Sequence, residues 1–141
     1  MTGELTGDLP KLIHCMVAFA WAWMAFGIFT GMIFGMYAFD GPLPTPSIMG
    51  PYDSCNRRLV RLGHVAFIML PLISMNYGYQ IATTSLAPAT QLLAVKLCWC
   101  GMIGVPSICM SSAFWRWTKY FFAIPVVCFF TALVMMAYGK M

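Results

Sequence analysis

Three side chains in this mostly apolar chain could hold a metal or a cofactor: His14, His64 and Lys96. A neutral imidazole is the usual protein ligand of haem b iron, and a lysine can pair with a porphyrin propionate or act as a second ligand. His14 and Lys96 are expected at one depth in the membrane, whereas His64 is expected in the opposite half. We therefore assign His14 as the candidate iron ligand and Lys96 as its neighbour, and include His64 as a further candidate cofactor residue.

Each of these residues also has a purely structural interpretation. A histidine one turn inside an apolar segment can be solvated, and the ammonium group of a lysine can reach the membrane surface. The small neighbours of His64, Gly63 and Ala66, favour a close helix contact in which its imidazole bonds a backbone carbonyl freed by a proline. The residues leave both interpretations open for His14 and Lys96 and favour the structural one for His64.

Composition indicates what kind of protein carries these side chains. Hydrophobic residues make up 61 % and charged residues 9 % of the 141 positions, and the mean hydropathy is +0.80, whereas about a quarter of the residues of soluble domains are charged. The apolar segments contain no paired carboxylates and no phosphate-binding loop, and the six cysteines are interpreted as small apolar thiols. We predict an integral membrane protein that contacts lipid and binds no nucleic acid.

Polar breaks divide the chain into four apolar segments. We predict transmembrane helices at about residues 12–39, 59–83, 88–110 and 120–138, which form one domain over residues 1–141. They are expected to pack as an all-α, antiparallel, up-down four-helix bundle. Pro88 is expected to begin the third helix, and Pro71, Pro106 and Pro125 are expected to kink the interiors of the last three helices.

Three glycines repeat at intervals of four residues in the first apolar segment: Gly27, Gly31 and Gly35. Residues spaced by four lie on one face of a helix, and small residues let another backbone approach closely where lipid removes most of the hydrophobic drive. The spacing predicts a helix-packing face, and in the subunit hypothesis below this face docks on a larger partner.

Basic residues gather at the two connections on one side of the membrane: Arg57 and Arg58, with the nearby Arg61, between the first two helices, and Arg116 and Lys119 between the last two. Because cytoplasmic loops carry an excess of lysine and arginine, both termini are expected on the non-cytoplasmic side. The expected location is a bacterial or organellar inner membrane.

The spacing of the first three arginines separates them into two directions. Arg57 and Arg61 are four residues apart and should point the same way, while Arg58 points elsewhere. Positive charge at a helix start is unfavourable, so lipid headgroups, Asp40 or Asp53, a partner subunit or a propionate should offset it. The simplest interpretation is that the arginines are topological charges.

Four short motifs, one in each helix, bear comparison with a known family. They are His14 with Trp21, the run Arg57-Arg58-Leu59 with Arg61, the run Val95-Lys96-Leu97, and Arg116 with Ile124-Pro125. Together they resemble the small four-helix membrane proteins of the HemJ/CopD type. The resemblance implies haem b binding, protoporphyrinogen oxidase activity, and functional roles for His14 and Lys96. Family members carry Asn-Glu before the fourth-helix proline, where Phe122 and Ala123 stand here.

Two functions are compatible with these features. The first is a small accessory subunit of a larger respiratory or photosynthetic electron-transfer complex, with the presence of haem b or another tetrapyrrole left open. The aromatic share of 16 % and the glycine face favour contacts with lipid and other membrane subunits. The second is a membrane oxidoreductase, a HemJ-like protoporphyrinogen oxidase with His14 as the haem ligand. Whether the chain is an enzyme is not decided by the residues.

Overall fold

The computed structural model describes residues 2–37 and 41–141, with the backbone alone at residues 2–7 and 48. Its helical segments are α1 (Thr2–Gly35), η1 (Ser47–Met49), α2 (Cys55–Ile81), α3 (Pro88–Phe114), η2 (Arg116–Phe121) and α4 (Ala123–Lys140). Four stretches are long and apolar enough to cross a membrane: Asp8–Gly35, Cys55–Ile81, Pro88–Phe114 and Arg116–Lys140. The predicted all-α membrane fold with four spans is confirmed, and the described residues contain no strand.

The first helix is shifted toward the N-terminus relative to the prediction. α1 begins at Thr2, ten residues before the predicted start, and includes Pro10. The prediction followed hydropathy, but helical hydrogen bonding continues through the polar N-terminal residues. The helix ends at Gly35, where the N–H groups of Met36 and Tyr37 bond carbonyls only three residues back, at 3.1 Å each. The last predicted positions, 38 and 39, lie outside the described residues.

The second and third helices are longer than predicted at the end that meets the loops. α2 begins at Cys55 instead of residue 59, because the side chain of Ser54 caps it and accepts a 3.3 Å hydrogen bond from the Arg57 N–H. α3 begins at Pro88, as its sequence predicts, and continues to Phe114 instead of residue 110. The addition to α2 places Arg57 and Arg58 on a helix.

The connection to the last helix is itself helical. Residues Arg116–Phe121 form the 3-10 segment η2, so α4 begins at Ala123 and Pro125 lies in its first turn. Proline is tolerated there because the first N–H groups of a helix have no helical partner. The prediction that Pro125 kinks the interior of the fourth helix is therefore wrong, whereas Pro71 and Pro106 do lie inside α2 and α3.

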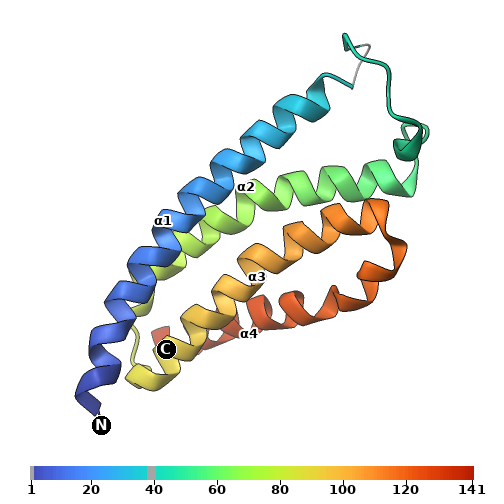
Figure 1. Ribbon diagram of the computed structural model, residues 1–141. Coiled ribbons are helices and arrows are strands. Elements are labelled where there is room, and N and C mark those ends of the chain that lie inside the picture. Colours follow the sequence, from blue (N-terminus) through green and yellow to red (C-terminus); the bar gives the residue numbers. More distant parts are fainter. Residues whose placement is uncertain (1, 38–40) are drawn as a thin grey trace.

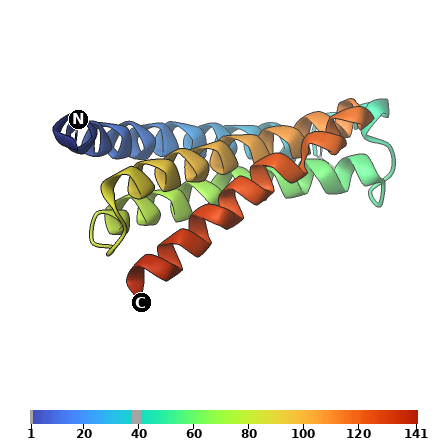
Figure 2. The ribbon, with the colours of Figure 1, turned by 90° about the horizontal axis from the view of Figure 1, so that it is seen from below.

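The four long helices alternate in direction, and both chain termini lie at the same end of the bundle (Figures 1 and 2). α2 and α3 form the middle of the molecule, with α1 packed mainly on α2 and α4 packed on α3. α1 and α4 lie on opposite sides of this central pair in both views. The outer helices therefore bury much less of their surface within the chain than the central ones do.

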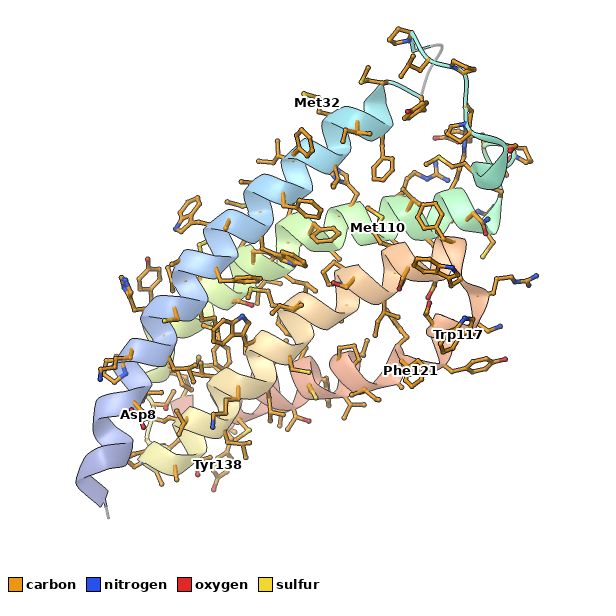
Figure 3. The ribbon with its side chains drawn as sticks, viewed as in Figure 1. Asp8, Met32, Met110, Trp117, Phe121 and Tyr138 are labelled. Atoms are coloured by element: carbon orange, nitrogen blue, oxygen red, sulfur yellow. The ribbon has the colours of Figure 1, made fainter. Side chains whose placement is uncertain are left out.

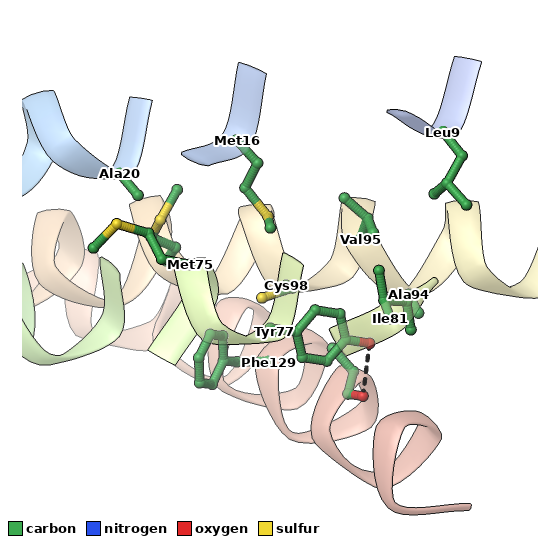
Figure 4. Close-up of a cluster of buried hydrophobic side chains, with 12 residues drawn as sticks. Leu9, Met16, Ala20, Met75, Tyr77, Ile81, Ala94, Val95, Cys98 and Phe129 are labelled. Atoms are coloured by element: carbon green, nitrogen blue, oxygen red, sulfur yellow. Dashed lines mark hydrogen bonds between the residues drawn. The ribbon is translucent and has the colours of Figure 1, made fainter. Parts of the chain in front are cut away.

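Many of the fully buried side chains lie in the half of the bundle that holds the termini, and Figure 4 shows a cluster of them, although Pro106 and Cys109 toward the loop end are fully buried as well. Met16 of α1 contributes to this core together with Val95 and Cys98 of α3, and all three side chains are fully buried. The hydroxyl of Tyr77 on α2 donates a 3.0 Å hydrogen bond to the carbonyl of Ala132 on α4. This bond joins two helices that otherwise make little contact.

Glycines lie where the helices approach most closely. A Cβ atom at Gly27 of α1 would lie 2.7 Å from the Cβ of Phe67 on α2, and one at Gly104 of α3 would lie 2.5 Å from the Cβ of Pro125 on α4. Real Cβ contacts are longer, so both interfaces require glycine. Gly35, by contrast, has no atom within 4 Å of a Cβ placed on it. Only the deeper part of the predicted glycine face therefore packs against α2.

This difference provides a matched pair of substitutions. We expect Gly27→Leu to destabilise the fold by about 1–3 kcal/mol or to separate α1 from α2, because the added side chain meets the backbone and Cβ of Phe67. Gly35→Leu should leave stability nearly unchanged. The measurement is the fraction of detergent-solubilised protein that stays monodisperse after a series of heating steps. Equal loss in the two variants would contradict the assigned α1–α2 contact.

Candidate functional site

The two residues proposed to hold a haem, His14 and Lys96, are exposed on the outer surfaces of α1 and α3. Their neighbours in sequence, Met16 and Val95, point into the core at similar depth, as Figure 4 shows. No hydrogen bond or ion pair joins His14 to Lys96 in the part of the chain that the structure describes. Met16 and Val95 are both fully buried and belong to one core cluster.

His64 lies in a different place, between α1 and α2. Its imidazole rests against Gly31, where a Cβ atom would collide with the ring and would lie 2.7 Å from Nε2. The Nδ1 atom is buried and has no hydrogen-bond partner. The expected bond from this ring to a proline-freed carbonyl is therefore not formed at Nδ1. The glycine face and the histidine, which the sequence presents as separate features, are two sides of one contact.

One turn closer to the loop, a pocket of about 240 Å³ opens between the end of α1 and the start of α2. It is lined by apolar and aromatic side chains and by two arginines: Phe34, Gly35, Tyr37, Met49, Tyr52, Arg57, Val60 and Arg61. The helices diverge here (Figure 1), and the segment containing η1 folds over the gap. The open space at Gly35 is part of this pocket.

Arg57 and Arg61 both reach the ring of Tyr52 from α2. Their guanidinium carbons lie 5.9 Å and 4.5 Å from the ring centroid, distances at which a cation is attracted to an aromatic face. Arg57 Nη2 also donates to Thr45 Oγ1 at 2.8 Å, and Arg61 Nη2 donates to the Tyr52 carbonyl at 3.5 Å. The two arginines share one direction, as their spacing predicts, and Arg58 does not line the pocket.

This end of the molecule carries a marked excess of positive charge. A second pocket of about 360 Å³, between α2, α3 and η2, includes Arg116 and Lys119. Asp53 is exposed and forms no ion pair with another described residue. Asp40, the other acid considered, lies outside the described residues.

Sequence patterns identified the arginines but not their pocket. Its remaining walls come from the loop and from η1, whose position depends on tertiary contacts such as the bond between Arg57 and Thr45. A sequence signal that could have indicated the pocket is the aromatic residue Tyr52, followed within nine positions by two arginines four apart. Groups of three or more His, Cys, Asp or Glu side chains that could hold a metal ion do not occur among the described residues.

Comparison with known proteins adds no functional assignment to this geometry. No protein family, curated protein or solved structure matches the chain.

Proposed function

We propose that this protein is a small accessory subunit of a larger membrane electron-transfer complex. The observation that carries the proposal is the exposed position of Lys96 on a membrane-spanning segment of α3. A charged residue within a span costs about 2.5–3.5 kcal/mol on insertion scales, and this cost falls when a partner supplies an acid or a water-lined surface. His14, exposed on α1, adds a second polar group on the outer face. The electron-transfer assignment rests on the resemblance of the sequence to HemJ/CopD-type proteins.

The outer helices supply the surface for such a partner. Large apolar side chains point away from the bundle along α1, η2 and α4, among them Met32, Trp117, Phe121 and Tyr138 (Figure 3). Such a surface packs equally well against lipid tails, so it does not by itself select a partner. The combination of this surface with Lys96 and His14 favours a protein neighbour over lipid alone.

The subunit proposal predicts a stable association. The wild-type protein, solubilised from its own membrane in a mild detergent, should co-purify with oxidase, reductase or photosynthetic subunits. Lys96→Gln should weaken that association, and Lys11→Gln, which also removes one exposed positive charge but near the start of α1, should not. Blue-native electrophoresis followed by mass spectrometry measures which subunits co-purify with the wild type and with each variant. A free monomer with no co-purifying redox subunits would refute the proposal.

Haem binding through His14 is tested in a separate experiment. Because His14 is exposed on α1, a haem b bound through it would lie on the outer face of the bundle, so it should be retained only in the intact complex. There we expect a Soret band that disappears in His14→Ala and persists in His64→Ala, whose ring is enclosed between α1 and α2. The absorption spectrum of each complex is the measurement. A band that is unchanged in His14→Ala would remove the ligand assignment.

The excess of basic residues at the loop end predicts its orientation. We propose that residues 41–54 and η2 face the cytoplasm and that both termini face the opposite side. Cys55, exposed at the start of α2, should react with a membrane-impermeant maleimide in inside-out vesicles and be protected in right-side-out vesicles. Cys55→Ser should abolish this labelling. Labelling only in right-side-out vesicles would reverse the orientation.

A further inference from the structure

The pocket between α1 and α2 combines two chemistries that membrane lipids also combine. Its surface is almost entirely apolar and includes the buried Val60 and Met49, and the two charged residues that line it are Arg57 and Arg61. A volume of about 240 Å³ is just below the roughly 300–1,000 Å³ that enclose whole drug-sized ligands. It therefore fits a segment of hydrocarbon chain better than a complete polar molecule.

The arginines retain the capacity to bind an anion. A guanidinium group has five N–H donors, and the structure uses one from Arg57, toward Thr45, and one from Arg61, toward the Tyr52 carbonyl. The Tyr52 ring beneath both groups holds them on the same side of α2. Planar guanidinium forks of this kind bind phosphate through paired hydrogen bonds.

The position of the arginines matches the headgroup region of a bilayer. Arg57 and Arg61 lie in the first two turns of α2, within about 9 Å of its start at 1.5 Å per residue. The headgroup layer on each side of the hydrocarbon core is about 5–7 Å thick. Val60 and Phe34 add apolar surface to the pocket beside the arginines. Arg58, Arg116 and Lys119 increase the positive potential at the same end.

We propose that this pocket binds one anionic membrane phospholipid, with its phosphate held by Arg57 and Arg61 and an acyl chain lying beside Gly35. The lipid fills the gap where α1 and α2 diverge and supplies the negative charge that the described residues do not. Gly35 keeps the space open, since a Cβ atom placed there would have no other atom within 4 Å and a larger side chain would extend into the pocket. The site stands independently of the accessory-subunit proposal, because it uses a different part of the molecule.

The proposal is tested on the purified, delipidated full-length protein. Phosphatidylglycerol or phosphatidylcholine with the same acyl chains is added in detergent, and bound lipid is counted by native mass spectrometry. We expect one phosphatidylglycerol per chain, bound about tenfold more tightly than phosphatidylcholine. Glycerol 3-phosphate, which has the phosphate without the chains, should not displace it.

Two variants separate the headgroup contact from the chain contact. The double variant Arg57→Lys/Arg61→Lys keeps the charge but loses the planar forks, so phosphatidylglycerol should bind about tenfold more weakly. Arg58→Lys, on the adjacent residue outside the pocket, should bind as the wild type does. Gly35→Leu keeps every charge and fills the pocket, so it should also lose the lipid while eluting as a folded, monodisperse protein.

Several results would overturn the proposal. Equal binding of the two lipids, displacement by glycerol 3-phosphate, or the same loss in Arg58→Lys would mean that the surface attracts anions without a built lipid site. Unchanged binding in Gly35→Leu would exclude the acyl-chain position. Retention of an acidic protein segment by Arg57 and Arg61 in place of phosphatidylglycerol would assign the pocket to a protein partner. If the arginine double variant does not fold, Gly35→Leu decides alone.

Discussion

Close approach of helix backbones at glycine is the constraint on which this fold depends. In a lipid bilayer the hydrophobic effect contributes little to contact between apolar side chains, so helices associate through van der Waals packing and a few hydrogen bonds. Gly27 and Gly31 allow α2 to pack closely on α1. On the other side, Gly101 and Gly104 allow α4 to pack closely on α3, where they contact Phe129 and Pro125. Between α2 and α3, a Cβ at Gly63 would lie 3.2 Å from the Met110 N–H nitrogen. Each neighbouring pair of helices thus has its own glycine contact.

The sequence predicted what local chemistry determines. Four spans follow from hydropathy, the start of α3 follows from Pro88, and the common direction of Arg57 and Arg61 follows from their spacing. It did not predict that His64 would rest on Gly31, because the register between two helices depends on the fit of their whole surfaces. It also missed η2, because this stretch was predicted as a connection between helices and 3-10 geometry has no hydropathy signal of its own. The pocket was not predicted because part of its lining comes from the loop between α1 and α2, and the path of a loop cannot be inferred from hydrophobic periodicity.

The polar side chains divide into two groups that the fold keeps apart. His14 and Lys96 lie on outer surfaces in the half with the termini, and Arg57, Arg61 and His64 follow one face of α2 from the loop toward the interior. Buried polar atoms without partners are uncommon, and among the described residues Nδ1 of His64 is one of three such side-chain atoms, with the indole nitrogens of Trp23 and Trp99. All three lie in the membrane-spanning helices, where water is not present to compensate them.

The length of α1 has a consequence for the membrane around it. Its apolar part, Asp8–Gly35, has 28 residues and is about 42 Å long, whereas the hydrocarbon core of a typical bilayer is about 30 Å thick. A helix of this length tilts, thickens the bilayer locally or extends its polar end, with Asp8 and Lys11, into the headgroup region, and α1 runs obliquely to α2 (Figure 1). Hydrophobic mismatch of this size favours thick bilayers, so the lipid composition of a membrane would help to determine where this protein accumulates.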